Sequence, residues 1–244
     1  HIISDLHLCT ERPDLTALFI KYMNEIAIKS DKLFVLGDLF ELWIGDDCLS
    51  PGDDSTDLEV YQIVIDAFNH YSTQVGELYF IHGNRDFLLS HEFENLTQGK
   101  LLKEPFYFNF RKENIALMHG DSLCIDDKEY QQFRTMVRNP TWQKEFLSLP
   151  KEKRIEIANN IRMQSKDAQK EKANEIMDVN VIAVNEFILN NNVDRLIHGH
   201  THRQADHQLE INHQNKFRNV LADWNEQGFY LELNNSGLSS HYFS

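Results

Sequence analysis

The sequence predicts an α/β fold, and two patterns carry this prediction. Short apolar runs of β type alternate with helical patterns along roughly the first hundred residues, an order that favours parallel strands in a central sheet. Five apolar runs also end in blocks rich in Asp, His, Asn and Gly. Ligands of open α/β sheets bind beyond the carboxyl ends of the strands, so we expect these blocks to meet along one rim.

Helices in the first half are predicted from apolar residues that recur on one face. After Pro13, which suits the first turn of a helix, these residues are Leu15, Leu18, Phe19, Tyr22, Met23 and Ile26. The expected elements of this half are, in order, strand 2–3, a helix from Pro13, strand 33–36, an acidic loop 45–57, helix 58–74, strand 78–81, a short helix near 90–97, and strands near 106–110 and 115–118.

From Asp126 to about Asn192 the strand signal is weak, and Pro140 and Pro150 divide a run of helical segments. A chain of 244 residues suits one α/β domain with an insertion and a sizeable core. We therefore expect a single domain over 1–244, with a helical insertion at about 126–192 that lies beside the five blocks. Strands are expected to return around 196–197, 207–213, 217–222 and 228–233.

The charge of the chain is strongly acidic but uneven. A formal net charge of −14 argues against non-specific nucleic-acid binding as the main function. Residues 128–172, however, contain 11 Lys and Arg against 6 Asp and Glu, a net of +5, which leaves −19 for the rest of the chain. This basic segment indicates a local anionic partner, such as phosphate groups or a membrane surface. A solvated helix face is the alternative.

Cysteine usage and the absence of long apolar runs bear on location. Cys9, Cys48 and Cys124 are few and odd in number and lack framework spacing, which predicts reduced thiols in a cytosolic protein. No run approaches the roughly 18 apolar residues of a membrane span, and no signal peptide is visible. Because the chain opens almost directly inside a strand, we expect a few native residues before His1.

The five blocks hold seven side chains of metal-binding type. Carboxylate and amide oxygens together with imidazoles suit Mn, Fe, Zn or Co better than Ca or a thiolate-bound metal. A single block reads as ordinary polar structure, but five blocks in order at strand ends indicate a metal site. The blocks are Ser4-Asp5-Leu6-His7, Gly37-Asp38-Leu39-Phe40-Glu41, Gly83-Asn84-Arg85-Asp86, Met118-His119-Gly120-Asp121 and Gly199-His200-Thr201-His202.

Across almost the whole chain, these blocks resemble the motifs of calcineurin-like metallophosphoesterases, namely D-x-H, GD-x-x-E/D, GN-x-D, H and GH-x-H. The resemblance implies a double β-sandwich flanked by helices, with a dinuclear centre at one edge and Asp38 as the bridging carboxylate. It implies that one metal is held by Asp5, His7, Asp38 and His202, and the second by Asp38, Asn84, His119 and His200. Asp86 and Asp121 are read either as groups that orient ligands or as turn residues.

One position departs from this pattern. Many members have His after the Asn of GN-x-D, where it binds phosphate or donates a proton, and this chain has Arg85. Arginine cannot act as an acid near neutral pH, but it binds phosphate oxygens well. An alkoxide leaving group needs a proton, whereas a phosphate monoester leaves readily without one. Arg85 therefore indicates that the bond cleaved is a pyrophosphate.

Longer strings resemble a narrower family, the UDP-2,3-diacylglucosamine pyrophosphohydrolases of Gram-negative lipid A biosynthesis. The strings are GDLFELWIGDD at 37–47, HGNRDFLL at 82–89, MHGD with L-C-x-D-D at 118–127, IMDVN at 176–180 and HGHTHR at 198–203. The resemblance implies cleavage to UMP and 2,3-diacylglucosamine 1-phosphate (lipid X) by metal-activated hydroxide attack on the uridine-side phosphorus, with two divalent ions, usually Mn²⁺.

The same resemblance implies roles for individual residues. Asp38, Asn84 and Arg85 are expected to take part in catalysis. Gln169 stands where relatives commonly have Asn, so its contact rests on a longer arm that carries the same amide. The expected substrate contacts are Asn84, Arg85, Asp127, Ser165, Gln169, Lys172 and His200. For Ser165 and Lys172, an exposed helix face is the alternative reading.

A substrate with two acyl chains needs an apolar groove beside the metals. The insertion offers Phe133, Met136, Trp142, Phe146, Leu147 and Met163, although ordinary helix packing would account for at least half of them. We expect a monomer without nucleic-acid partners, peripherally bound to the cytoplasmic face of the inner membrane. Two alternatives stay open. A soluble nucleotide-sugar or phosphodiester hydrolase would lack the amphipathic insertion, and a non-catalytic interaction module would have lost metal ligands.

Overall fold

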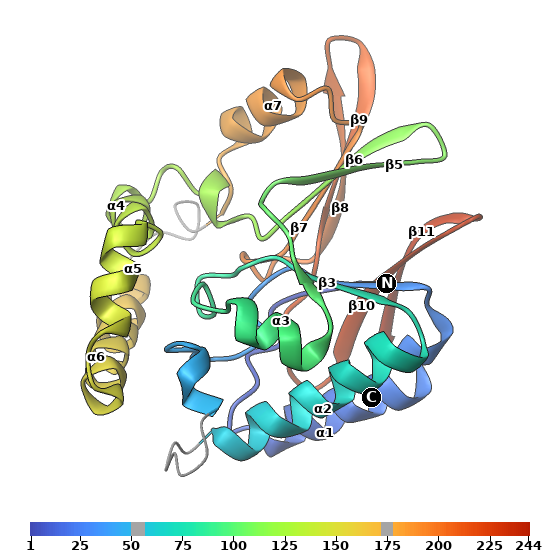
Figure 1. Cartoon of the computed structure of the whole chain (residues 1–244). Helices are drawn as coiled ribbons and strands as arrows, with labels where there is room; N and C mark the ends of the chain where they lie inside the picture. Colours follow the sequence, from blue (N-terminus) through green and yellow to red (C-terminus); the bar gives the residue numbers. More distant parts are fainter. Residues whose placement is uncertain (50–56, 172–177) are drawn as a thin grey trace.

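The fold consists of two β-sheets packed against each other, with helices on both outer faces (Figure 1). The computed structural model describes residues 1–49, 57–171 and 178–244. The first sheet has the order β11-β10-β1-β2-β3-β4 and the second the order β5-β6-β7-β9-β8. The parallel pairing expected from the strand–helix alternation is present, but the strands form two sheets and not one central sheet. The double sandwich implied by the family resemblance is confirmed.

The strands of the first sheet are β1 (Ile2–Ile3), β2 (Lys32–Val35), β3 (Glu77–Phe80), β4 (Lys100–Leu101), β10 (Gly228–Asn234) and β11 (Gly237–Phe243). Those of the second are β5 (Phe106–Phe110), β6 (Glu113–Met118), β7 (Arg195–His198), β8 (Ala205–Ile211) and β9 (Gln214–Val220). Parallel pairing joins β1 to β2, β2 to β3, β3 to β4, β6 to β7 and β7 to β9. The carboxyl ends of the strands that carry the five blocks therefore converge from two sheets.

Alternate side chains of the first sheet build the two inner layers of the core. Phe34 stacks on Tyr79 at 4.9 Å and on Phe108 of the second sheet at 5.9 Å. On the opposite face, Phe80 meets Phe68 of α2 edge to face at 5.2 Å. Helices α1 (Pro13–Glu25) and α2 (Leu58–Gln74) thus cover one outer face, and the short α3 (His91–Thr97) follows β3.

In its described residues, the expected helical insertion forms four helices. Helices α4 (Lys128–Val137), α5 (Pro140–Leu147) and α6 (Lys151–Glu171) stack beside one another, away from the sheets in Figure 1. Proline is the first residue of α5, and Asn139 caps that helix by accepting hydrogen bonds from the backbone N–H groups of Thr141 and Trp142. The fourth helix, α7 (Val181–Asn190), instead covers the outer face of the second sheet, where Val184 and Ile188 are buried.

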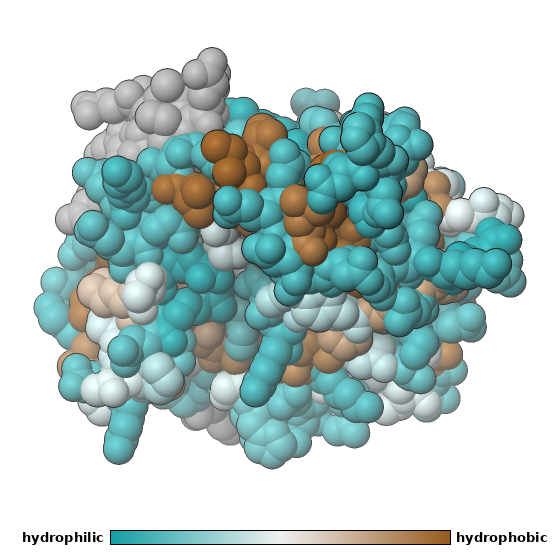
Figure 2. All heavy atoms as spheres, turned by 90° about the horizontal axis from the view of Figure 1, so that it is seen from above, coloured by the Kyte–Doolittle hydropathy of each residue, from teal (hydrophilic) through white to brown (hydrophobic). Residues whose placement is uncertain are grey.

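Short 3₁₀ segments complete the described chain at Ala27–Lys29, Asp46–Leu49 and Asp121–Leu123. No helix within the described ranges is both long enough and apolar enough to cross a membrane. All three cysteines are buried and free, as the sequence predicts for thiols. Figure 2, seen from above, shows apolar side chains gathered among hydrophilic ones on this face. In α7, Val181 and Ile182 are 68% and 66% exposed.

Candidate metal centre

The backbone brings the five blocks together through hydrogen bonds between neighbouring loops. The N–H groups of Asp5 and His7 donate to the carbonyls of Gly37 and Asp38, at 3.1 and 3.0 Å. The second sheet is tied to the first by the N–H of His200, which donates to the Asp5 carboxylate at 3.0–3.1 Å. Carboxyl ends of strands from both sheets therefore form one site.

Five of the predicted metal ligands have a left-handed backbone. The φ angles of Asp5, His7, Asp38, His200 and His202 lie between +50° and +68°. This conformation is uncommon for non-glycine residues, although Asp and His tolerate it better than most. Such residues cluster at functional sites because the surrounding structure must hold them there.

Two glycines are required because the loops approach so closely. A Cβ atom on Gly83 would lie 2.2 Å from the Oδ1 and backbone N of Asp38, and one on Gly199 would lie 2.2 Å from Asp5 Oδ2. Any side chain at either position would displace a predicted metal ligand.

The predicted ligand atoms form two adjoining groups. In the first, His7 Nε2 lies 3.4 Å from His202 Nε2 and 3.7 Å from Asp38 Oδ2, and His202 Nε2 lies 3.4 Å from Asp5 Oδ1. Atoms about 2.0–2.2 Å from a shared ion would be spaced on this scale. Asp5, His7 and His202 could hold a metal ion together, as could Asp5, Asp38 and His119.

The second group surrounds Asn84. Its Oδ1 lies 3.0 Å from His119 Nε2 and 2.8 Å from His200 Nδ1, while His119 Nε2 lies 3.8 Å from Asp38 Oδ1. Asp38 thus presents one oxygen to each group, as a bridging carboxylate would. The structure brings together all seven predicted ligands, and their hard oxygen and imidazole donors fit divalent ions such as Mn²⁺.

Hydrogen bonds on the remote ring nitrogens fix the imidazole rings. His7 Nδ1 donates to Glu41 Oε2 at 2.9 Å, and His119 Nδ1 donates to the carbonyl of Leu36 at 2.8 Å. These contacts leave each Nε2 free to face the site. Partners of this kind set the tautomer and orientation of metal-binding histidines.

The electrostatics of the site favour positive charge. Burial would lower the pKa of His119, but the nearby Asp38 and Asp5 carboxylates outweigh burial and raise it to about 9. Burial would raise the pKa of Asp5, but the hydrogen bond from His202 and the charges of nearby histidines bring it well below its usual range. His200 behaves differently, because burial and the neighbouring His119 lower its pKa to about 4.

Asp86 and Asp121 hold the surrounding loops and helices. Asp86 is buried and accepts hydrogen bonds from the backbone N–H groups of Leu39 and Gly83, both at 2.7 Å. It therefore joins the second and third blocks. Asp121 accepts from the Tyr130 hydroxyl at 2.9 Å and from Arg134 Nε at 2.8 Å, and so anchors α4 beside the metal centre.

The centre opens into a cavity of about 550 Å³, and the predicted Arg85 lines it. The buried Nε of Arg85 has no hydrogen-bond partner among the described residues, and its backbone N–H donates to Asp38 Oδ1 at 2.9 Å. Asp127 and His200 also line the cavity. Ser165 and Gln169 belong to the stretch of α6 whose side chains are not described, and Lys172 lies outside the described residues.

Apolar side chains line the same cavity as the metal ligands. Of the six candidates in the insertion, Phe133, Trp142 and Phe146 line the cavity. Met136, Leu147 and Met163 are not among its lining residues and are 41–63% exposed, so their predicted contact with acyl chains stays a prediction. Five further apolar residues that were not predicted also line the cavity, namely Leu42, Trp43, Ile44, Phe87 and Leu88. These residues follow the second and third metal blocks, so their position was the available signal.

The basic segment is partly neutralised inside the molecule. Arg134 pairs with Asp121 at 2.8 Å, Arg154 with Asp47, and Arg162 with Glu41 at 2.6 Å. These arginines bind acidic groups of the protein itself. The inference of an anionic partner from the net charge of this segment is weakened accordingly.

Comparison with known proteins identifies the family. The model of the calcineurin-like phosphoesterase family matches residues 1–204. A UDP-2,3-diacylglucosamine hydrolase from Chromohalobacter salexigens is 46% identical, covering 91% of this chain and 87% of the relative. Proteins of the same name from Escherichia coli O157:H7 and Haemophilus influenzae PittGG are 43% and 42% identical, covering 95% and 97% of this chain and 93% and 95% of theirs. The chain therefore belongs to the calcineurin-like phosphoesterases and, within them, to the family of the UDP-2,3-diacylglucosamine hydrolases.

Proposed function

We propose that this protein hydrolyses the pyrophosphate bond of UDP-2,3-diacylglucosamine, giving UMP and 2,3-diacylglucosamine 1-phosphate for lipid A biosynthesis. One observation carries the proposal. A single cavity of about 550 Å³ is lined both by predicted metal ligands and by the apolar side chains of Phe133, Trp142 and Phe146. A nucleoside diphosphate linked to a two-tailed lipid combines the same two chemistries. The names of the relatives point to the same substrate.

Two divalent ions, which we take to be Mn²⁺, are part of the proposal. Asp5, His7, Asp38 and His202 would hold one, and Asp38, Asn84, His119 and His200 the other. Bound there, the ions would lower the pKa of a water molecule and polarise the phosphoryl oxygens. The raised pKa of His119 and the depressed pKa of Asp5 support this reading, because both indicate a site that stabilises positive charge.

The chain's own residues would orient and neutralise the pyrophosphate. Arg85 lines the cavity at the third block, and its buried Nε has no described partner. Its guanidinium can therefore donate hydrogen bonds to phosphoryl oxygens. Asn84 lies beside it. With the uridine-side phosphorus at the metals, lipid X would depart as a phosphate and need no proton donor. Asp127, Ser165, Gln169 and Lys172 remain proposed substrate contacts.

We also propose peripheral binding to the cytoplasmic face of a Gram-negative inner membrane, by a monomer. The support is the lipid substrate and the exposed apolar residues of α7, among them Val181 and Ile182. Ile182→Glu should reduce sedimentation with liposomes of phosphatidylethanolamine and phosphatidylglycerol. Equal sedimentation of the parent and of Ile182→Glu would exclude this face of α7 as the membrane contact.

The function is tested by incubating the purified protein with UDP-2,3-diacylglucosamine or with UDP-N-acetylglucosamine, each with and without Mn²⁺. We expect Mn²⁺-dependent release of UMP from the lipid substrate and little from the soluble nucleotide sugar. Equal cleavage of both substrates would favour a soluble nucleotide-sugar hydrolase. No cleavage of either, at full metal occupancy, would favour a non-catalytic module.

A further inference from the structure

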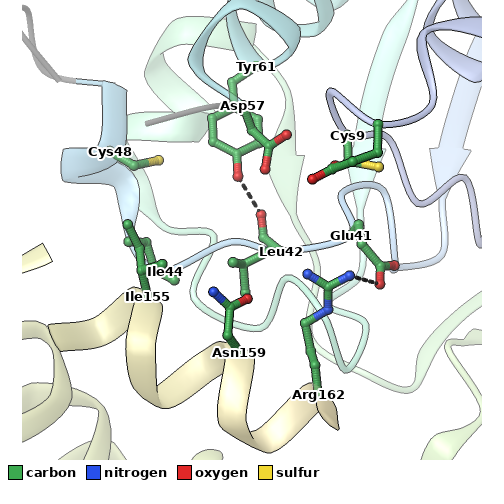
Figure 3. A pocket seen from close by; sticks show the side chains of 11 residues that line it. Cys9, Glu41, Leu42, Ile44, Cys48, Asp57, Tyr61, Ile155, Asn159 and Arg162 are labelled. Carbon is green, nitrogen blue, oxygen red and sulfur yellow. Dashed lines mark hydrogen bonds and ion pairs between the residues drawn. The ribbon is translucent and has the colours of Figure 1, made fainter. Parts of the chain in front are cut away.

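Helix α6 contacts the metal centre through a chain of two side chains. A small second cavity, of about 120 Å³, lies beside the centre between α6 and the loops after β1 and β2 (Figure 3). Arg162 extends from α6 across this space to Glu41. Both residues also line the larger cavity. They therefore stand at the wall between the two spaces.

Glu41 uses one oxygen for each neighbour. Its Oε1 accepts a hydrogen bond from Arg162 Nη2 at 2.6 Å, and its Oε2 accepts one from His7 Nδ1 at 2.9 Å. The opposite nitrogen of His7 faces Asp38 and His202 within the first ligand group. The guanidinium therefore fixes the carboxylate, and the carboxylate fixes the plane of the imidazole.

A second arginine shows that α6 has an independent anchor. Arg154 is 1% exposed and donates to the carbonyl of Ile44 at 2.7 Å and to Asp47 Oδ1 at 2.8 Å. It precedes Arg162 by eight residues, or about two helical turns, so both side chains leave the same face of α6. Arg154 holds the helix to the loop after β2 and touches no predicted ligand or its partner. Arg162 can therefore serve a purpose other than attachment.

We propose that Arg162 is a positioning residue, which couples α6 to the metal ligand His7 through Glu41. The inference rests on the proposed metal centre. Removing such an outer partner of a metal-binding histidine typically weakens metal binding 10–100-fold. Because coupling between two sites is reciprocal, a metal ion bound by His7 also stabilises the docked position of α6. The part of the substrate cavity wall that α6 provides is therefore less mobile in the metal-bound protein.

The coupling is tested without substrate, so that direct contact between Arg162 and the substrate plays no part. Mn²⁺ binding to metal-free protein is measured by titration calorimetry for Arg162→Gln and Arg162→Lys. Lys153→Gln is the matched control, because Lys153 on the same helix pairs with Glu156 in a bridge whose side chains are 53% and 58% exposed. Hydrogen exchange of α6 peptides is followed with and without Mn²⁺, and thermal melting checks that each variant is folded.

We expect Arg162→Gln to bind Mn²⁺ about tenfold more weakly, at the lower end of that range because it acts through Glu41. Arg162→Lys should recover part of the affinity, and Lys153→Gln should match the parent. Mn²⁺ should slow exchange in α6 of the parent but not of Arg162→Gln. If folded Arg162→Gln binds Mn²⁺ as tightly as the parent, and Mn²⁺ slows exchange in its α6 as much as in the parent, the coupling is overturned. A parent that binds no Mn²⁺ would also overturn it. A parent that shows the coupling yet leaves UDP-2,3-diacylglucosamine intact would refute only the proposed function.

Discussion

Replacing Arg85 with alanine should slow hydrolysis strongly while leaving the fold nearly unchanged. The backbone N–H of Arg85 donates to Asp38 and its carbonyl accepts from the N–H of Trp43 at 3.1 Å. Alanine retains both contacts. The buried Nε has no described partner to lose, so the main loss is a charge that faces the cavity.

The size of the kinetic effect follows from that geometry. Removing one preorganised donor to developing negative charge costs about 2.7–4 kcal/mol, or roughly 10²–10³ in rate. Arg85→Lys should restore only part, because a planar fork that binds two oxygens becomes a point charge. Arg85→His should bring no gain on the pyrophosphate, yet it should improve cleavage of an alkyl phosphodiester, whose alkoxide leaving group needs a proton.

The assay is kcat/KM of the three variants at neutral pH, on the lipid substrate and on an alkyl phosphodiester. Thermal melting of each variant with Mn²⁺ controls for folding and metal binding. If Arg85→Ala cleaves UDP-2,3-diacylglucosamine as fast as the parent, the leaving-group argument is wrong and Arg85 serves only the loop.

Three further outcomes are expected. Asp38→Ala, which removes the carboxylate shared by both ligand groups, should abolish turnover and lower the metal content found by elemental analysis; two retained metals with full activity would contradict a dinuclear centre. Phe133→Ala should raise KM for the diacylated substrate, because Phe133 lines the cavity. Met136→Ala, at an exposed residue of the same helix, should leave KM unchanged, and equal KM values for the two variants would exclude Phe133 from acyl binding. His119 has a pKa of about 9 without metal, so its proton stabilises the metal-free fold fully below its unfolded value near 6.5 and ceases to do so as pH rises through 9. Mn²⁺ must displace that proton at pH 7–8, so its affinity should rise with pH up to about 9, and calorimetry in buffers of different ionisation enthalpy should detect proton release; no release at pH 7–8 would refute the charge state.

Local signals predicted most of the elements. The helix predicted at about 58–74 agrees with α2, whose buried residues recur at helical spacing. The strand β11 was missed because its alternation of exposed and half-buried residues carries little apolar signal at the edge of a sheet. The number of sheets could not be predicted from strand–helix alternation, since pairing of β10 with β1 joins opposite ends of the chain.

The metal site was predictable for a different reason. Each block is a short string whose backbone strain and close approach restrict the residues allowed, as at Gly83 and Gly199. Contacts between distant segments left no such local mark. Glu41 was visible in its block, but nothing in the sequence indicates that Arg162, 121 positions later, would bind it. The apolar lining residues after the second and third blocks were not predicted, because each directly follows a polar block and carries no periodic apolar pattern of its own.

The arginines of the insertion show how composition alone can mislead. A net charge of +5 over 128–172 indicated an external anion, yet Arg134, Arg154 and Arg162 bind Asp121, Asp47 and Glu41. A guanidinium that pairs with a carboxylate of another segment helps to set the position of its helix, and its charge is neutralised within the protein. The insertion therefore contains two functional groups of residues that its net charge does not distinguish. Apolar residues face the cavity, and cationic residues dock the helices beside the metal-binding loops. Any attraction of the insertion to an anionic membrane would therefore have to come from basic residues other than these three.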